Sequence, residues 1–198
     1  MVLPNVLRMI NRPIVPAPRT LDDFKVALVN IAFPSIILLF GDIVGLPKLL
    51  ARAQQHGKQL VVHLDLLDGI GKDKAGIKFL ARLGVPAVIT TKSHLGSAAR
   101  DAGLMVIQRV FLMDSEALRQ GINTLKKFTP DALEVLPAAV PAGVVQRLIR
   151  ETGLPILAGG LMSTREEVHS ALKTGVYAVS TSRPGLWRDF TPSSSPSA

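Results

Sequence analysis

Eight short apolar runs recur about every two dozen residues, and they constrain the fold more than any other feature of the sequence. Each run is rich in β-branched or aliphatic residues, and stretches with a helical pattern separate the runs. Strands that are apolar almost throughout are typical of a parallel sheet covered on both faces, and strict β–α alternation implies right-handed crossovers. The runs are residues 13–19, 34–40, 59–65, 86–92, 105–112, 131–137, 155–161 and 176–182.

Eight β–α repeats predict an α/β protein with a single-domain (β/α)₈ barrel of the TIM type, which would be small at 198 residues. The alternative is an open doubly wound sheet, for which about five or six strands would be more usual. No Gly-x-Gly-x-x-Gly follows the first strand, so the barrel is favoured. We expect it to span residues 1–190, and we expect the serine-rich residues 191–198 to form a disordered tail.

Two of the expected helices carry local start signals. Ser163 and Glu166 have the spacing of a capping box, and Gly175 is expected to end the helix that they begin. Asp114 or Ser115 could cap the helix that follows the fifth strand in the same way.

Composition excludes several classes of protein. Hydrophobic residues make up 47% of the chain and charged residues 19%, which is typical of a globular protein. No apolar run approaches the ~20 residues that cross a bilayer, and the first residues lack the pattern of a secretory signal, so no membrane association is predicted. The chain has no cysteine, which fits a cytoplasmic protein. Its net charge of +8 favours polyanionic partners, including nucleic acid.

Polar residues follow almost every expected strand. In a barrel, binding and chemistry gather at the carboxyl ends of the strands. A purely structural barrel would not need a polar group at nearly every one of these ends. Before the last two strands, these residues are Arg19, Asp42, His63, Asp65, Thr90, Thr91, Lys92, Gln108, Arg109 and Glu134.

The last two strand ends have the residue types that bind phosphate. Gly159 and Gly160 would let backbone N–H groups approach an anion. Ser180, Thr181 and Ser182 add hydroxyl donors, and the loops after the seventh and eighth strands often hold phosphate in barrels. Tight packing at the glycines and ordinary turn chemistry at the hydroxyls are the alternative explanation. Because both features fall on consecutive strand ends, we predict a phosphate site.

The remaining charged residues leave more than one role open. Arg109 lies in an apolar strand and needs a carboxylate or a phosphate, and Glu134 on the next strand could pair with it inside the protein, at a ligand, or both. Asp65 could contact ligand hydroxyl groups, and His63 with Asp65 could also bind a metal or act as acid and base. Without a second histidine at ligand spacing, we expect no metal. Lys92 could contact phosphate or form a Schiff base, or it could be solvated.

Four segments together resemble a known family. They contain "VVHLDLLDGIG", "VIQRVFLMDS", "LEVLPAAVP" and "AGGLMSTREE…STSRPGLW", and the resemblance covers roughly residues 10–187. The chain resembles the glycerol-3-phosphate-responsive antiterminators, the regulatory proteins of bacterial glycerol-uptake operons. The resemblance implies a barrel that binds sn-glycerol 3-phosphate and, when loaded, acts on leader mRNA so that transcription passes a terminator.

We therefore expect a regulator of glycerol-utilisation genes and not an enzyme, with sn-glycerol 3-phosphate as its ligand and no cofactor. Loading could order loops or shift a dimer equilibrium, so a homodimer is one form that the protein could take. The alternative is a barrel enzyme, such as an isomerase, epimerase, aldolase or prenyltransferase, acting on a small phosphorylated substrate through Asp65, Lys92 and Glu134.

Basic residues on the expected helices are candidate RNA contacts, although each cluster could also be an ordinary solvated face. Aromatic residues make up only 5% of the chain, so backbone contacts to helical RNA are favoured over base stacking. The candidates are Lys74, Lys78, Arg82, Lys126, Lys127, Arg147 and Arg150, with Arg183 and Arg188 as further phosphate contacts.

Overall fold

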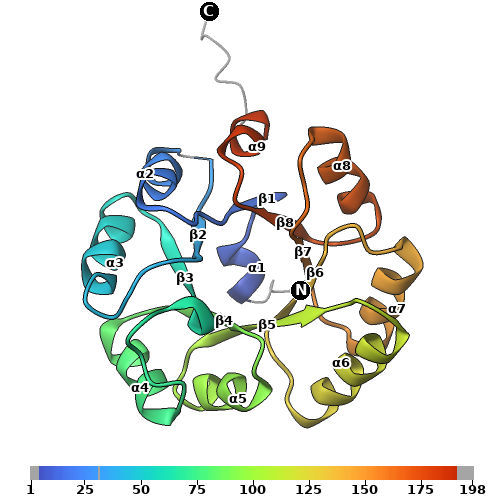
Figure 1. The fold of residues 1–198 in the computed structure, drawn as a ribbon, viewed down its shortest axis with the longest axis horizontal. Helices are drawn as coiled ribbons and strands as arrows, with labels where there is room; N and C mark the ends of the chain where they lie inside the picture. The colour runs from blue at the N-terminus through green and yellow to red at the C-terminus, as the bar shows by residue number, and fades with distance from the viewer. Residues whose placement is uncertain (1–4, 31, 191–198) are drawn as a thin grey trace, which may run out of the picture.

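Within residues 5–30 and 32–190, which the computed structural model describes, eight parallel strands form the inner wall of a barrel (Figure 1). At Lys126 and Lys127 only the backbone is described, and the tail predicted at residues 191–198 lies outside these ranges. The strands are β1 (Ile14–Pro16), β2 (Ser35–Leu38), β3 (Gln59–His63), β4 (Ala87–Thr90), β5 (Met105–Phe111), β6 (Ala132–Leu136), β7 (Ile156–Gly159) and β8 (Ala178–Thr181).

The strands follow one another around the barrel in chain order, and β8 returns to lie beside β1. Each paired neighbour is parallel, from the β2–β3 pair to the β8–β1 pair, in which Val15 lies opposite Ser180. Between β1 and β2 the wall is joined just past the strands, where Leu39 N donates to Pro18 O at 3.1 Å. The barrel is thus nearly closed, which confirms the predicted fold class over an open sheet.

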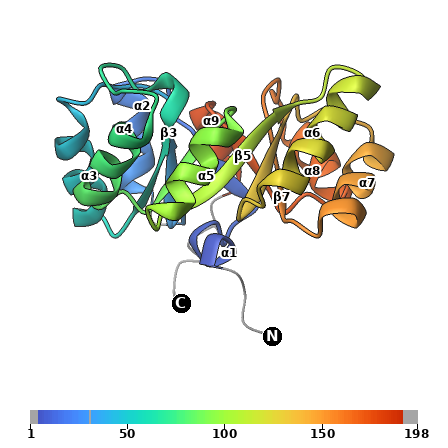
Figure 2. The same ribbon diagram turned by 90° about the horizontal axis from the view of Figure 1, so that it is seen from below.

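Helices cover the outside of the strands, and one short helix lies across the end of the barrel (Figures 1 and 2). None of the helices in the described ranges combines the length and the apolar character needed to span a bilayer. The helices are α1 (Asn5–Met9), α2 (Leu21–Val29), α3 (Leu46–Gln55), α4 (Lys74–Leu83), α5 (Ser93–Asp101), α6 (Ser115–Lys127), α7 (Ala142–Thr152), α8 (Arg165–Lys173) and α9 (Pro184–Asp189), with a 3₁₀ turn η1 (Leu64–Leu66) after β3.

Side chains alternate along the strands between two apolar layers. On β2, Ile36 and Leu38 belong to the layer under the helices, whereas Ile37 belongs to the lumen of the barrel. The buried residues Val6 and Ile10, in α1 and directly after it, belong to the lumen layer. Apolar side chains therefore close the amino-terminal end of the lumen, and among the described residues its polar end lies at the carboxyl ends of the strands.

The start of α8 differs by one residue from the prediction. Thr164 Oγ1 accepts from Glu167 N at 3.2 Å, and Glu167 Oε2 accepts from Thr164 N at 3.0 Å. The capping box predicted at Ser163 and Glu166 is therefore wrong. Both residue pairs fit the Ser/Thr-x-x-Glu pattern, and the helix begins after Thr164, whose backbone is extended. At α6 the predicted cap is confirmed, because Asp114 Oδ1 accepts from Ala117 N at 2.7 Å.

Candidate functional site

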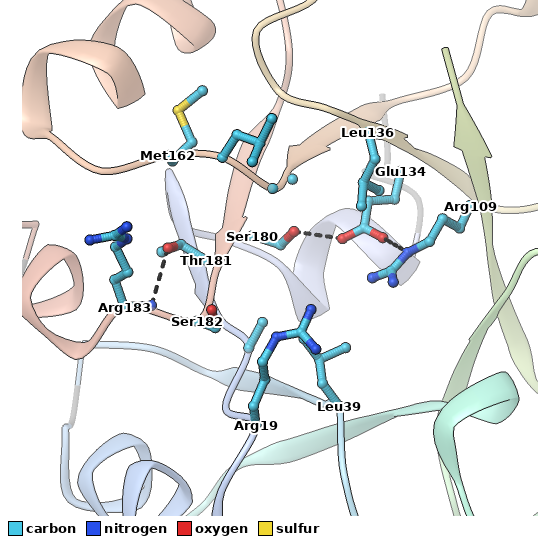
Figure 3. Close-up of a pocket in the computed structure, with 14 residues that line it drawn as sticks. Arg19, Leu39, Arg109, Glu134, Leu136, Met162, Ser180, Thr181, Ser182 and Arg183 are labelled. Atoms are coloured by element: carbon cyan, nitrogen blue, oxygen red, sulfur yellow. Dashed lines mark hydrogen bonds and ion pairs between the residues drawn. The ribbon is translucent and has the colours of Figure 1, made fainter. Parts of the chain in front are cut away.

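A cavity of about 230 Å³ lies at the carboxyl ends of the strands (Figure 3). It is smaller than most drug-sized ligand sites, which run from about 300 to 1,000 Å³, so it suits a ligand of few atoms. Strands β1, β2 and β5 to β8, with the loops that follow them, supply its wall. The lining residues are Ala17, Arg19, Leu39, Arg109, Glu134, Leu136, Gly159, Gly160, Leu161, Met162, Ser180, Thr181, Ser182 and Arg183.

The polar floor of this cavity is the top layer of the lumen. Along β5, the lumen-facing Ile107 is followed two residues later by Arg109, and along β6 Ala132 is followed by Glu134. On β8, Ser180 follows Ala178 in the same way. Because side chains two apart on a strand share a face, Arg109, Glu134 and Ser180 form a polar layer directly above an apolar layer of the lumen.

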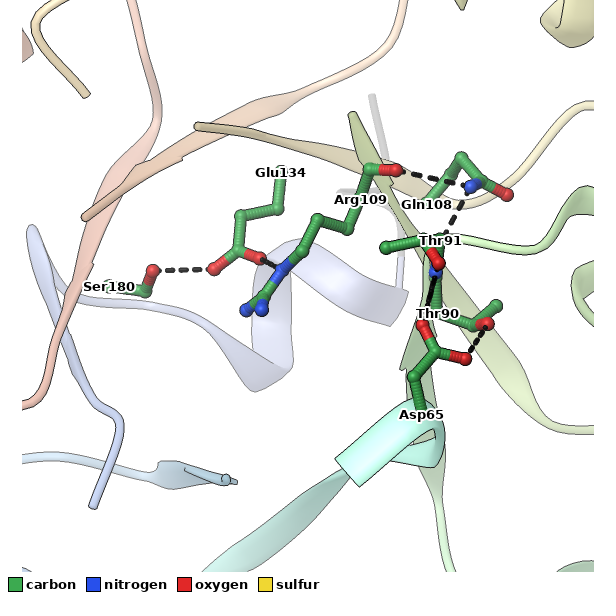
Figure 4. A network of polar contacts seen from close by, with 7 residues as sticks. All are labelled: Asp65, Thr90, Thr91, Gln108, Arg109, Glu134 and Ser180. Carbon is green, nitrogen blue, oxygen red and sulfur yellow. Dashed lines mark hydrogen bonds and ion pairs between the residues drawn. The ribbon is translucent and has the colours of Figure 1, made fainter. Parts of the chain in front are cut away.

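Glu134 holds the centre of this layer. Arg109 Nε donates to its Oε2 at 2.5 Å, and Ser180 Oγ donates to its Oε1 at 2.5 Å (Figure 4). Glu134 is fully buried and Arg109 nearly so. Because Nε makes the ion pair, the two terminal nitrogens of Arg109 are left pointing away from the carboxylate (Figures 3 and 4). The structure confirms the internal Arg109–Glu134 pair, and the same arginine still lines the cavity.

The two positions at the end of β7 are glycine for different physical reasons. A Cβ atom on Gly159 would lie 2.5 Å from Ser180 Oγ and 3.1 Å from Glu134 Oε1, so a side chain there would break up the polar layer. Gly160 has a φ of +78°, in the left-handed region that glycine adopts at little cost. Both glycines and the hydroxyl groups after β8 line one cavity, which is the arrangement that a phosphate site needs.

The loop after β8 is fixed by its own hydrogen bonds. Thr181 O accepts from Trp187 Nε1 at 2.8 Å, which ties the buried indole of α9 to the strand end. Thr181 Oγ1 accepts from Arg183 N at 3.3 Å (Figure 3). Ser182 and Arg183 are thereby held at the cavity wall.

Positive charge predominates at the cavity. Among the described lining residues there are three guanidinium groups, on Arg19, Arg109 and Arg183, and one carboxylate, on Glu134. Within the described ranges neither Arg19 nor Arg183 forms an ion pair, although the Arg183 charge adds to the backbone hydrogen bonds that lower the pKa of Glu167. The lining residues themselves therefore carry an excess of two positive charges. A dianion is the ligand charge that would balance them.

Asp65 and Lys92 lie outside the lining of this cavity. Asp65 accepts hydrogen bonds from Thr90 Oγ1 at 2.8 Å, Thr91 N at 2.7 Å and Thr91 Oγ1 at 2.9 Å (Figure 4). Burial alone would raise the pKa of Asp65, but these hydrogen bonds outweigh it and hold the pKa below its usual value. Asp65 thus joins the end of β3 to the end of β4, and the exposed Lys92 precedes α5.

His63 is buried at the end of β3, and within the described ranges neither ring nitrogen has a hydrogen-bond partner. Burial, followed by the nearby Arg109 charge, lowers the pKa of His63 to about 4, although the Asp65 carboxylate opposes the shift. The imidazole is therefore neutral at pH 7. The described residues include no cluster of three or more His, Cys, Asp or Glu side chains able to hold a metal ion.

The predicted RNA contacts lie on the outer helices. Lys74, Lys78 and Arg82 are exposed along α4 and line a groove of about 440 Å³ against α5, which contributes Asp101. On the same helix Phe79 is 38% exposed, whereas Ile77 and Leu80 are buried in the core. On α7, Arg147 Nε pairs with Glu151 at 2.6 Å, and Arg150 is exposed. The side chains of Lys126 and Lys127 lie outside the description.

Arg183, predicted to contact RNA phosphate, lies in the cavity wall. Its position directly after the Ser180–Ser182 hydroxyls was a signal that could have identified it. Leu136 and Met162 also line the cavity and were not predicted. Their apolar character gave no reason to separate them from core residues.

Comparison with known proteins gives consistent matches. The family model described as glycerol-3-phosphate responsive antiterminator matches residues 14–187. The protein YgcP of Escherichia coli K12 is 32% identical over 155 residues, which cover 77% of this chain and 80% of that protein.

Two solved structures are similar in sequence and in fold. The glycerol uptake operon antiterminator regulatory protein of Listeria monocytogenes superposes with a TM-score of 0.86 at 31% identity, covering 95% of this chain and 99% of that one. A glycerol uptake operon antiterminator-related protein of Thermotoga maritima superposes with a TM-score of 0.80 at 31% identity, covering 89% and 98%. More distant barrels, at 10–13% identity, include aldolases and an epimerase, and they show the fold alone.

Proposed function

Because the chain belongs to the family of glycerol-3-phosphate responsive antiterminators, we propose that it senses sn-glycerol 3-phosphate in the cavity at the carboxyl ends of its strands. Once loaded, it binds the leader mRNA of glycerol-utilisation genes in the cytoplasm and lets transcription pass a terminator. It acts as a ligand-binding regulator and uses no cofactor.

The observation that carries this proposal is the charge and size of the cavity. The lining residues carry an excess of two positive charges around a space of about 230 Å³, which includes the glycines after β7 and the hydroxyls after β8. A phosphate carries close to two negative charges at neutral pH, and a three-carbon polyol adds few atoms. The terminal nitrogens of Arg109 and the side chain of Arg19 would hold the phosphate or the adjoining hydroxyl groups.

The engagement of the carboxylates supports a regulator over the alternative enzyme. A general acid or base must exchange a proton with its substrate. Both oxygens of Glu134 are occupied, by Arg109 and Ser180. Both oxygens of Asp65 are occupied by Thr90 and Thr91. These groups therefore support a pre-organised binding site better than they support proton transfer.

A thermal-shift comparison tests the ligand. At a hundredfold excess over its dissociation constant, a ligand stabilises the folded chain by about 2.7 kcal/mol, which is a shift of several degrees for a chain of this length. We expect that shift with sn-glycerol 3-phosphate and much smaller shifts with glycerol or inorganic phosphate. Equal shifts with all three compounds would contradict a specific sensor.

Two substitutions locate the response in the cavity. Gly160→Asp forces a left-handed backbone on a side chain and adds a negative charge, and we expect it to abolish the shift. Arg19→Gln, at an exposed position of the cavity wall, should weaken the response without affecting folding. Gly143→Asp is the matched control, because a Cβ on Gly143 meets no atom within 4 Å.

A gel-shift titration tests the regulatory half of the proposal. Ligand can change RNA affinity only if it has different affinities for the two states of the protein. We expect leader RNA to bind more tightly as sn-glycerol 3-phosphate is added, and Arg19→Gln to require more ligand for the same effect. An RNA affinity that stays constant through the titration would contradict the gating.

A further inference from the structure

His63 belongs to a layer of the lumen whose other members all line the cavity. Alternate strands of such a barrel contribute side chains to the same layer. In the apolar lumen, β1, β3, β5 and β7 contribute Val15, Val61, Ile107 and Leu157. Two residues further on, where the chain returns to the same face, these strands lead to Ala17, His63, Arg109 and Gly159. Of these four, Ala17, Arg109 and Gly159 line the cavity, so His63 completes the layer on the side of β3.

His63 lies across the lumen from the glycines at the end of β7. The strands follow one another around the barrel in chain order, so β3 lies opposite β7 (Figure 1). In this layer Gly159 has no side chain and Ala17 only a methyl group, which leaves Arg109 and His63 as its polar members. A ligand whose phosphate lies at the ends of β7 and β8 therefore extends its other end towards β3.

Both ring nitrogens of His63 are unpaired. The side chain is 3% exposed, and neither Nδ1 nor Nε2 has a hydrogen-bond partner in the described ranges. Buried polar side chains are nearly always paired, because an unpaired one loses its bonds to water without replacement. The ring is neutral at pH 7, so it carries one N–H donor and one acceptor nitrogen. Both are available to a ligand.

Hydroxyl groups suit this ring better than a phosphate does. A phosphate dianion only accepts hydrogen bonds, so it would leave the acceptor nitrogen of the ring unpaired. A hydroxyl group both donates and accepts, and can therefore pair with either nitrogen. The groups that would attract the phosphate are the guanidinium groups of Arg19 and Arg109, both of which line the cavity.

We propose that His63 binds a hydroxyl group of the ligand and thereby makes the cavity specific for a polyol phosphate over phosphate alone. The inference rests on the proposed function and deepens it, because it names the residue that recognises the glycerol part of the ligand. Arg19, Arg109 and the end of β7 hold the phosphate, and β3 supplies the partner for the opposite end.

Loading must uncover the imidazole, since His63 is not among the residues that line the cavity. The charges of Arg109 and Arg19 both act on His63, which places the two guanidinium groups within electrostatic reach of the ring. Arg109 is tied to Glu134 only through Nε, and Arg19 forms no ion pair within the described ranges. A phosphate at β7 draws both groups towards itself and opens the ring to the hydroxyl.

Calorimetry at pH 7 with two ligands tests the inference. Propyl phosphate has the phosphate and the three carbons of sn-glycerol 3-phosphate but neither hydroxyl group. We expect it to bind the unsubstituted chain about tenfold more weakly or worse, as the loss of one hydrogen bond implies. His63→Leu should weaken sn-glycerol 3-phosphate by a similar factor and leave propyl phosphate unchanged. A purely structural histidine would not produce this coupling between residue and hydroxyl.

Three controls accompany this comparison. Leucine suits a buried position, so thermal unfolding of unliganded His63→Leu at pH 7 should show no loss of stability. His63→Gln, which keeps a donor and an acceptor, should recover part of the lost affinity. His56→Leu changes an exposed histidine at the end of α3, at the other end of the barrel, and should bind both ligands like the unsubstituted chain.

Nitrogen-15 NMR of the histidine rings gives a second readout. The chain has four histidines, and the signals missing from His63→Leu identify those of His63. Saturating sn-glycerol 3-phosphate should shift these signals, whereas propyl phosphate and inorganic phosphate should shift them much less. Equal shifts with inorganic phosphate would mean that the ring responds to the anion, and the assignment to a hydroxyl group would be overturned.

The same titrations separate this inference from the proposed function. If sn-glycerol 3-phosphate does not bind the unsubstituted chain, the proposed function fails and the role of His63 fails with it. If it binds and His63→Leu binds it as tightly, only the role of His63 is overturned. The same holds if His63→Leu weakens both ligands by equal factors, because the imidazole then only shapes the lumen.

Discussion

Glu134 and His63 are both buried in the wall of the barrel, but the surroundings of Glu134 stabilise its charged form, whereas those of His63 stabilise its neutral form. Glu134 is compensated by Arg109 and receives a further hydrogen bond from Ser180. Neither ring nitrogen of His63 has a hydrogen-bond partner in the described ranges, and burial, followed by the Arg109 charge, lowers the pKa of His63 by more than the Asp65 carboxylate raises it. The barrel therefore accepts a carboxylate at the first position and only a neutral imidazole at the second.

His63 should make stability depend on pH. Its pKa is about 4 in the folded protein against an ordinary value of 6.5. The unfolded chain therefore binds a proton between these values while the folded chain does not. The stabilisation is complete above pH 6.5 and is lost as pH falls through about 4, by about 3 kcal/mol in all.

Urea denaturation between pH 7 and pH 4 measures this effect. His63→Leu should lose much less stability over that range than the unsubstituted chain. His94→Leu, which changes an exposed histidine on α5, should keep the original slope. Identical slopes for His63→Leu and the unsubstituted chain would mean that His63 has a partner when folded.

For single residues, the sequence predicts contacts best where burial allows a side chain only one kind of partner. An arginine in an apolar strand needs a countercharge, so the Arg109–Glu134 pair was predictable. Asp65 had several available roles, and its actual partners, Thr90 and Thr91, depend on how η1 turns after β3. The sequence also could not show that His63 has no partner, since that depends on everything packed around it.

Among the elements, α8 shows how finely a helix start is decided. The helix leads away from the loop after β7, which lines the cavity. Its cap is Thr164, whose hydroxyl accepts from Glu167 N, and Glu167 accepts from the backbone of Ser163 and Thr164. These backbone hydrogen bonds hold the pKa of Glu167 below its usual value.

Removing the cap should destabilise the protein. Thr164→Ala takes away the acceptor for Glu167 N, and we expect a loss of about 1 kcal/mol in the free energy of unfolding. Ser163→Ala is the matched control, because only its backbone N–H takes part. Urea denaturation at pH 7 distinguishes the two. A larger loss in Ser163→Ala than in Thr164→Ala would restore the cap that the sequence pattern first suggested.

The strands were predictable as elements because each is an apolar run, but their ends were not. β1 occupies only Ile14–Pro16 of the run 13–19, and the residues beyond it form the wall of the cavity. Hydrophobic pattern marks burial, and the tops of strands and the loops above them are buried alike. The helix α1, with five residues, is too short to show a helical period at all.

For the whole molecule, two of the positively charged surfaces matter to the proposed function. Part of it faces the cavity, and part lies along α4, where Lys74, Lys78 and Arg82 have no ion-pair partner in the described ranges. Residues four apart on a helix share a face, so these three cations form one stripe. We assign the first surface to the ligand and the second to RNA.

Salt dependence tests the assignment of the stripe. Each phosphate contact contributes about −0.9 to the slope of log affinity against log salt on a duplex, and somewhat less on a single strand. Replacing Lys74, Lys78 and Arg82 by alanine should weaken leader-RNA binding and make the slope shallower by about two to three. The thermal shift with sn-glycerol 3-phosphate should not change.

Arg119→Ala is the control, since Glu116 already pairs with that cation at 2.6 Å. If the triple variant keeps its slope while Arg147→Ala and Arg150→Ala lose theirs, the RNA surface lies on α7 instead.

The helix α1 and the apolar side chains of the lumen close the far end of the barrel, so the cavity opens at one end. A ligand therefore enters and leaves through the same opening. A partner that binds across this opening would strengthen ligand binding, and the ligand would strengthen binding of the partner by the same factor, because coupling between two sites is reciprocal. An opening at the far end would give the ligand a second exit, so the closed end leaves control of release to the carboxyl ends of the strands.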